Sequence, residues 1–274
     1  MLLRIGSRGS RLALTQAELA AEQLRGPGIE IALVPITTAG DRDRTKPFGQ
    51  IGERGVFVKE LEEALLAGTI DVAVHSAKDM TSTDTAGLVV GAYLPREDSR
   101  DALCGAGEIR PGMRIGTASV RRRAQLLALE PSLSIEPLRG NIDTRLRKRS
   151  ERGLDAVVLA ACGLDRLGLA GEIGRRFEPD EVLPEAGQGA LALQVRVGEE
   201  DVVADANDSE TSRRVELERA CVAAIGGGCL APIAAYHNGE TLTGLVADPD
   251  GRWLERRTGE DPVALAAELA ALTA

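Results

Sequence analysis

Apolar and polar residues follow two distinct spacings in the first third of the chain. Short apolar runs at residues 2–5, 29–37 and 71–74 are typical of strands that are buried in a sheet. Residues 11–25 and 56–67 instead place apolar side chains three or four positions apart, which predicts amphipathic helices. Strands that alternate with helices in this way indicate a parallel sheet with crossover helices.

The same order of elements recurs in the middle of the chain. Arg114–Thr117 (RIGT) repeats the pattern of Arg4–Ser7 (RIGS), and each runs into a helical stretch that starts with arginine. The apolar run at 134–138 corresponds to the run at 29–37, because a glycine and a polar residue follow both. These ordered echoes predict two related α/β lobes, although any two α/β halves share some of this pattern.

Residues 187–196 combine a glycine-rich loop with a further strand. We expect this strand to return to the first lobe, so that the chain crosses between the lobes twice. Crossings of this kind act as hinges around a central cleft.

The last part of the chain has a different pattern. Residues 209–225 are helical and lead into Gly226–Cys229. Three strand-like runs and a final helix follow, with turn residues between them, at 233–236, 241–247, 252–257 and 262–272. These runs predict a small α+β domain. The expected domains are therefore lobe 1 (1–94 with 188–206), lobe 2 (95–187) and a C-terminal domain (207–274).

Composition limits the classes of function. Of the 274 residues, 43% are hydrophobic and 27% are charged, which suits a folded globular protein. Only 2% are aromatic, which disfavours a protein that stacks single-stranded bases. The net charge is −9, yet arginines are dense from Arg114 to Arg149. This combination favours a small anionic ligand over a nucleic acid.

No membrane partner is expected. The N-terminal residues lack the apolar stretch of a secretory signal, and no uncharged apolar run approaches the length of a membrane span. We therefore expect a cytoplasmic protein.

The four cysteines lack both the close pairs of a zinc site and the density of a disulfide scaffold. We expect free thiols and no metal site. Cys104, Cys162 and Cys221 are expected to pack in the interior. Cys229 follows three glycines, which let the backbone approach a ligand closely. An exposed thiol there is a candidate reactive group, although glycine richness alone is a weak signal.

Hydroxyl and guanidinium groups gather at two predicted junctions between a strand and a helix, at 7–11 and 117–123. Free N–H groups at a helix start, for which Ser10 is a candidate N-cap, favour a bound anion. Arginine adds paired hydrogen bonds to a carboxylate. The alternative is a solvated helix start with surface arginines. Because the two junctions lie at matching positions of the two predicted lobes, we favour an anion-binding site over a solvated helix start.

Two further strand ends carry candidate chemistry. The run that ends at Val74 delivers Ser76, Lys78 and Asp79 to the edge where ligands bind in open α/β sheets. A carboxylate beside a lysine in a cleft can stay ionised and stabilise a developing cation. The alternative is an exposed ion pair, which contributes little. His75 is expected to be partly buried and satisfied.

The second strand end, at 138–145, carries Arg139 and Arg145, which can both reach an anion. Residues 147–149 fit the solvated face of a helix better.

Taken together, these segments resemble the porphobilinogen deaminases, also called hydroxymethylbilane synthases. The most specific patterns are HSAKD (75–79), LRGN (138–141), GQGA (187–190) and GGCLAPI (227–233). The resemblance runs in order along nearly the whole chain, through residues 3–17, 52–66, 71–79, 96–102, 115–126, 138–146, 162–169, 183–191 and 226–233.

The resemblance implies an activity and a fold. Members of this family are transferases of tetrapyrrole and haem biosynthesis. They join four porphobilinogen molecules, release ammonia at each step and free the linear tetrapyrrole hydroxymethylbilane. The growing chain is built on a dipyrromethane cofactor, which the resemblance places as a thioether on Cys229. The implied fold class is α/β, with two lobes like those of type II periplasmic binding proteins around a cleft and a small α+β C-terminal domain.

The resemblance also implies roles for individual residues. Asp79 matches the aspartate that stabilises positive charge on the pyrrole nitrogens during the reaction. The residues that match positions holding the cofactor are Ser76, Lys78, Thr117, Ser119, Arg121, Arg122, Asn141 and Gln188. Those that match positions holding the substrate are Arg8, Ser10, Arg139, Arg145 and Arg166. Each pyrrole carries an acetate and a propionate, so many guanidinium partners are needed.

Two other classes of function stay open from the residues alone. The lobes and arginine junctions also suit a two-lobed binding or sensor protein without catalysis. The arginine cluster would also allow nucleic-acid binding with a strong salt dependence. The resemblance further implies a monomer with porphobilinogen as its small-molecule partner.

Overall fold

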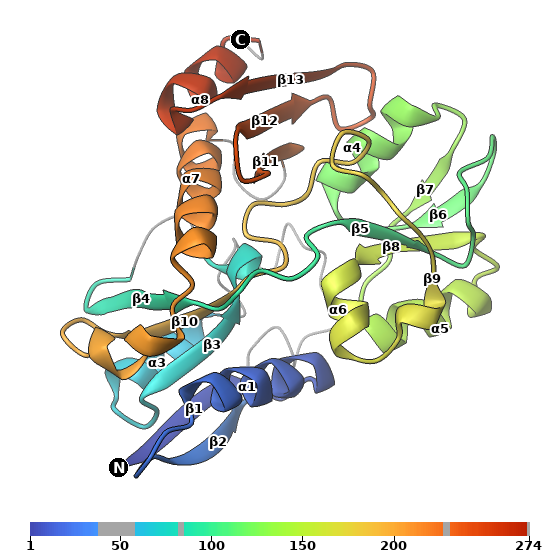
Figure 1. Cartoon of the computed structure of the whole chain (residues 1–274). Coiled ribbons are helices and arrows are strands. Elements are labelled where there is room, and N and C mark those ends of the chain that lie inside the picture. The colour runs from blue at the N-terminus through green and yellow to red at the C-terminus, as the bar shows by residue number, and fades with distance from the viewer. Residues whose placement is uncertain (38–57, 82–84, 227–230, 273–274) are drawn as a thin grey trace. The chain divides into compact units, whose positions relative to one another are not determined.

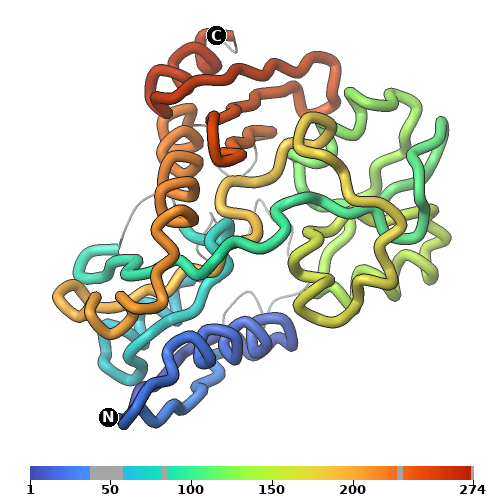
Figure 2. The backbone as a smooth tube through the Cα atoms, in the orientation of Figure 1, coloured from blue at the N-terminus to red at the C-terminus, as the bar shows by residue number. Residues whose placement is uncertain are grey.

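The computed structural model describes the chain over residues 1–37, 58–81, 85–226 and 231–272. These residues divide into two compact units, which Figure 1 and Figure 2 show by colour along the chain. Unit 1 comprises residues 1–97 and 190–213, and unit 2 comprises residues 98–189 and 214–274. The chain therefore passes between the units more than once.

Unit 1 is built on a five-stranded mixed sheet in the order β2-β1-β3-β10-β4. Its strands are β1 (Leu2–Arg8), β2 (Glu30–Ile36), β3 (Val72–Ser76), β4 (Leu88–Tyr93) and β10 (Leu191–Arg196). Strand β1 is parallel to β2 and β3, whereas β10 is antiparallel to β3 and β4. The expectation that residues 187–196 return a strand to the first lobe is confirmed.

Helices pack on the two faces of this sheet. They are α1 (Arg11–Leu24) and α3 (Lys59–Leu66), and short 3-10 helices lie at Ala77–Asp79 (η2), Glu200–Val202 (η4) and Ala204–Ala206 (η5). The alanine-rich face of α1 packs on Val72 and Val74. Leu61 of α3 packs with Ala73. Because side chains alternate along a strand, α1 and α3 cover opposite faces.

Unit 2 contains a second five-stranded sheet in the order β7-β6-β8-β5-β9. Its strands are β5 (Asp101–Cys104), β6 (Arg114–Gly116), β7 (Ser134–Glu136), β8 (Ala156–Ala160) and β9 (Ile173–Arg176). Its helices are α4 (Val120–Leu129), α5 (Ile142–Glu151), α6 (Ala161–Arg166) and the 3-10 helix η3 (Ala170–Glu172).

The two sheets share one topology. In each, three parallel strands are followed by an antiparallel strand from elsewhere in the chain, which is β10 in unit 1 and β5 in unit 2. The registers also agree, because Gly6 lies opposite Ala73 and Gly116 lies opposite Val157. The predicted duplication of two α/β lobes is confirmed.

The C-terminal part forms a small antiparallel sheet in the order β11-β12-β13. Its elements are α7 (Ser209–Ile225), β11 (Ile233–His237), β12 (Leu242–Ala247), β13 (Leu254–Gly259) and α8 (Pro262–Ala270). Cys221, Leu265 and Leu269 are buried together in its core. The expected α+β meander is confirmed, whereas the division of the chain into three domains stays a prediction.

The element boundaries differ from the sequence-based ones at a few ends. The first strand continues beyond Ile5 to Arg8, because Ser7 and Arg8 still pair with the neighbouring strand β2. The helix expected at 56–67 begins at Lys59 in the described part, and residues 56–57 lie outside it. The last strand covers Leu254–Gly259, two residues later than expected.

Candidate functional site

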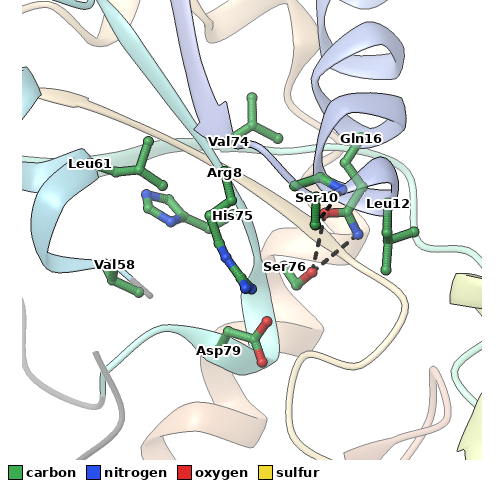
Figure 3. Close-up of a pocket in the computed structure, with 11 residues that line it drawn as sticks. Arg8, Ser10, Leu12, Gln16, Val58, Leu61, Val74, His75, Ser76 and Asp79 are labelled. Carbon is green, nitrogen blue, oxygen red and sulfur yellow. Dashed lines mark hydrogen bonds between the residues drawn. The ribbon is translucent and has the colours of Figure 1, made fainter. Parts of the chain in front are cut away.

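A pocket of about 70 Å³ lies in unit 1 at the carboxyl ends of β1 and β3 (Figure 3). Its polar lining comprises Arg8, Ser10, Gln16, His75, Ser76 and Asp79. Apolar side chains from α1 and α3 complete the wall. Parallel strands end at one edge of a sheet, so the topology alone brings these polar groups together.

Local structure positions each group. Arg8 ends β1, and Ser10 caps α1 by accepting a hydrogen bond from Ala13 N–H at 3.2 Å. Asp79 ends the 3-10 helix that directly follows β3. Figure 3 shows the Arg8 side chain pointing toward the carboxylate of Asp79. Arg8, Ser10, Ser76 and Asp79, all expected at one site from the sequence, thus line one pocket.

Lys78 lies in the same 3-10 helix and is half-buried. It is not among the described residues that line this cavity. Lys78 is therefore the sequence neighbour of Asp79, but only Asp79 of the two lines the pocket.

Gln16 joins the pocket from the buried face of α1. Its Nε2 donates a hydrogen bond to Ser76 Oγ at 3.1 Å, which fixes the serine hydroxyl at the pocket wall (Figure 3). Sequence reasoning did not single out Gln16. The sequence did contain a sign of its role, because Gln16 lies on the same helix face as the apolar residues Ala17 and Ala20. A glutamine buried on such a face needs a hydrogen-bond partner.

His75 is buried and hydrogen-bonded, as expected. Its Nε2 lies 3.0 Å from Gln194 Oε1, and Gln194 Nε2 donates to Glu62 Oε1 at 2.9 Å. Because the amide nitrogen faces the Glu62 carboxylate, the amide oxygen faces the imidazole, and His75 Nε2 carries the proton. Burial lowers the pKa of His75 to about 4, against the opposing effect of the Gln194 hydrogen bond. The imidazole is therefore neutral at pH 7.

Unit 2 holds a second group of the expected residues around a buried carboxylate, Asp101. Arg122 Nη2 donates to Asp101 Oδ1 at 2.7 Å, and Arg121 Nη1 lies 2.9 Å from Oδ2. Gln188 Nε2 also donates to Oδ1, at 2.8 Å. Two adjacent candidate residues and a third, 66 positions after Arg122, thus meet at one side chain.

Asp101 is fully buried and ionised. Burial by itself would raise the pKa of its carboxyl group, but the Coulombic attraction and the hydrogen bonds of Arg121 and Arg122 together hold the pKa well below its usual range. Sequence reasoning missed Asp101, although the segment REDSRDA contains it. Four other charged residues in that segment make an aspartate there resemble a surface residue.

The start of α4 contributes two hydroxyl groups near these arginines. Ser119 caps the helix and accepts a hydrogen bond from Arg122 N–H at 3.4 Å. Thr117 Oγ1 accepts from Ser119 N–H at 3.2 Å. Arg166 Nη2 donates to Gly189 O at 2.8 Å, which ties Arg166 to the turn that carries Gln188. Hydrogen bonds that involve backbone atoms therefore connect these residues to Arg122, which contacts Asp101, and to Gly189, the neighbour of Gln188.

The residues at the start of α5 form a separate group. Asn141 is the N-cap of α5, and Arg145 Nε donates to Gly140 O at 2.7 Å. The carbonyl of Arg139 accepts from Lys148 Nζ at 3.1 Å. These hydrogen bonds hold the start of α5 against the segment that precedes it.

Cys229, the expected anchor of the cofactor, lies outside the described residues. Helix α7 ends at Ile225, and Gly226 follows with a φ of 76°, a left-handed conformation that favours glycine. Within the described residues, no helix is both long and apolar enough to cross a membrane.

Comparison with protein families gives two matches that together cover almost the whole chain. The model of the porphobilinogen deaminase dipyromethane cofactor binding domain matches residues 3–204. The model of the porphobilinogen deaminase C-terminal domain matches residues 212–274. Both matches agree with the resemblance found in the sequence.

Curated relatives agree with the family models. The chain is 46% identical to the porphobilinogen deaminase of Syntrophotalea carbinolica, over 96% of this chain and 88% of that protein. It is 43% identical to the porphobilinogen deaminase of Bacillus subtilis, over 99% of this chain and 92% of that protein.

Solved structures give weaker likenesses. The methionine-binding protein MetQ matches with a TM-score of 0.48 and 15% identity, over 77% of this chain and 92% of that chain. A nutrient-binding protein from Burkholderia cenocepacia bound to methionine matches with a TM-score of 0.45 and 12% identity, over 77% and 94%. The family models and the curated relatives, in contrast, match nearly the full length of the chain, and the chain belongs to the porphobilinogen deaminase family.

Proposed function

We propose that the chain condenses four porphobilinogen molecules, releases ammonia at each step and frees hydroxymethylbilane, as a transferase of tetrapyrrole biosynthesis. The observation that carries this proposal is the match of residues 3–204 to the cofactor-binding domain of the family. The pocket that gathers Asp79, Arg8 and Ser10 supports it, because it offers a carboxylate beside anion-binding groups. Haem is the end product that we infer for the pathway.

The residues of unit 2 fit a dipyrromethane cofactor. Its two pyrrole rings carry carboxylates, and these need buried hydrogen-bond donors. Arg121 Nε and Nη2 and Arg122 Nε are buried and lack hydrogen-bond partners among the described residues. Donors of this kind accommodate carboxylates well. When bound to Cys229, the cofactor supplies the primer to which substrate pyrroles are joined.

Asp79 carries the catalytic role in this proposal. Positive charge develops on a pyrrole nitrogen as the amino group leaves and the new carbon–carbon bond forms. A carboxylate held at the end of a 3-10 helix in the pocket stabilises that charge electrostatically. Arg8, whose side chain points toward Asp79 in Figure 3, can bind a substrate carboxylate.

The other candidate residues hold carboxylates and orient rings. We assign cofactor binding to Ser76, Lys78, Thr117, Ser119, Arg121, Arg122, Asn141 and Gln188. We assign substrate binding to Arg8, Ser10, Arg139, Arg145 and Arg166. Arginine suits this task because its planar fork matches the geometry of a carboxylate. We further propose a cytoplasmic monomer that binds neither nucleic acid nor membrane.

Intact mass spectrometry tests the proposed function. The purified protein should exceed its sequence mass by one dipyrromethane and give a colour reaction with an aldehyde reagent for pyrroles. Cys229→Ser should have the bare sequence mass, whereas Cys221→Ser, which changes a buried cysteine of the core, should keep the added mass. An active wild-type protein with the bare mass would overturn the proposal. Porphobilinogen that is bound and returned unchanged would favour a binding protein.

A further inference from the structure

The guanidinium group of Arg121 has one edge with no hydrogen-bond partner among the described residues. This edge consists of Nε and Nη2, and both atoms are buried. The carboxylate atom Glu185 Oε2 lies 3.7 Å from Nε, beyond hydrogen-bonding distance. Buried donors without acceptors are costly and rare in proteins. The edge therefore calls for an acceptor that the described residues do not supply.

Other arginines of the chain show what this edge binds. Arg4 donates through Nε and Nη2 to the carboxylate of Asp71, at 2.9 and 2.7 Å. Arg100 uses the same two atoms toward Asp98, at 3.0 and 2.9 Å. A carboxylate matches this edge because its two oxygens have the same spacing as the two donors. The expected acceptor for Arg121 is therefore also a carboxylate.

The charged groups around Asp101 do not satisfy this edge. Two guanidinium groups, those of Arg121 and Arg122, contact the fully buried carboxylate of Asp101, and their side chains are only 3% and 6% exposed. Glu185 supplies a second negative charge, but its carboxylate is partly exposed and lies 3.7 Å from Arg121 Nε. The buried Nε and Nη2 atoms of Arg121 therefore still lack a hydrogen-bond acceptor among the described residues.

Asp101 decides which edge of Arg121 is left for the expected carboxylate. It contacts Nη1, and Leu183 O accepts from the same nitrogen at 2.6 Å. Arg122 is fixed in the same way, with Nη2 on Asp101 and Nη1 on Val158 O at 3.1 Å. With Nη1 of Arg121 and both Nη groups of Arg122 held, the Nε–Nη2 edge of Arg121 and the Nε atom of Arg122 stay available.

We propose that Asp101 is a positioning residue, which fixes Arg121 and Arg122 so that the Nε–Nη2 edge of Arg121 receives one carboxylate of the dipyrromethane cofactor. This inference rests on the proposed function. Asp101 itself touches neither the substrate nor the cofactor in this proposal. Its removal would leave the donors present but no longer held in one orientation.

The test measures how fast the full chain acquires its cofactor. Wild type and Asp101→Asn are produced without porphobilinogen, and the loaded mass peak is followed by intact mass spectrometry after porphobilinogen is added. Loading should be at least about tenfold slower in Asp101→Asn. The variant no longer holds Arg121 in place, and a misplaced charge-assisted hydrogen bond to the cofactor carboxylate weakens binding by about tenfold or more. Loading of the folded variant at the wild-type rate would overturn the proposal.

Asp98→Asn is the matched control. Asp98 also holds two arginines in unit 2, Arg100 and Arg176, so its substitution removes a comparable carboxylate from a comparable pair. It should lower thermal stability but load at the wild-type rate. Equal slowing in both variants would show a general loss of structure and overturn the positioning role.

A second variant covers the case in which Asp101→Asn does not fold. Arg121→Lys keeps the positive charge near Asp101 but lacks the planar edge. It should also load slowly, and loading at the wild-type rate would overturn the proposal. A wild-type protein that gains no mass would contradict the proposed function itself. A wild type that loads together with an equally fast Asp101→Asn would contradict only the role of Asp101.

Discussion

Glu218 of α7 accepts a hydrogen bond from Gly187 N–H at 2.7 Å through its Oε2 atom. Its other oxygen accepts from His237 N–H at 2.8 Å, so one buried carboxylate joins a long helix, the turn before Gln188 and the C-terminal sheet. Both bonds lie within unit 2. Glu218 therefore links the turn that carries Gln188 to the small α+β part of the chain.

Glu218→Ala should destabilise the protein strongly. The substitution leaves two buried N–H groups without acceptors, which should lower the free energy of unfolding by about 2 to 4 kcal/mol. Urea unfolding followed by circular dichroism measures this. Glu216→Ala, an exposed change on the same helix, should stay within about 0.5 kcal/mol of wild type. Similar values for both variants would contradict the prediction.

Gly116→Ala should also destabilise the protein, for a steric reason. An added Cβ would lie 2.8 Å from Leu138 and 2.9 Å from Leu154, both buried beneath β6. Overpacking of this kind should cost about 1 to 3 kcal/mol in unfolding free energy. Gly171→Ala is the control, because a Cβ there meets nothing within 4 Å. An unchanged melting temperature in Gly116→Ala would show that the side chains can yield.

The buried His75 should make stability depend on pH. Its pKa is lowered from 6.5 to about 4 by burial, so between these values the unfolded chain binds a proton that the folded chain does not. Stability is then complete above pH 6.5 and falls as the pH drops toward 4. Between pH 7 and pH 5 the loss due to this group should be about 2 kcal/mol.

Chemical unfolding at several pH values measures this contribution. In His75→Gln the part due to the imidazole should disappear, while the part due to carboxylates such as Asp101 remains. An identical pH dependence in wild type and His75→Gln would show that the imidazole does not titrate as proposed.

Asp79→Ala should separate catalysis from cofactor attachment. Loss of the carboxylate that stabilises developing positive charge should reduce turnover by about a hundredfold or more. The added dipyrromethane mass should persist, because the proposed tether is Cys229. Asp205→Ala, an exposed aspartate of unit 1, should turn over normally. Normal turnover in Asp79→Ala would remove Asp79 from its assigned role.

The sequence alone determined several elements of the fold and much of the pocket in unit 1. Periodicity identified α1 and β3, because a helix and a strand each expose one face to the core and repeat their apolar residues accordingly. The echo of Gly6 in Gly116 identified the two lobes, since both glycines occupy the same register position. Asp79 and Arg8 could be placed together because parallel strands end at one edge.

Only the tertiary structure decided how the polar groups are paired. Asp101 stands among charged residues in the sequence, and nothing local shows that it is fully buried between Arg121 and Arg122. Gln16 and Ser76 are 60 residues apart and meet only because α1 packs against β3. Periodicity reports which face of an element is buried, but partners across the core depend on long-range packing. Only the folded structure therefore showed that Asp101 contacts Arg121 and Arg122, two arginines that the sequence had predicted as binding residues.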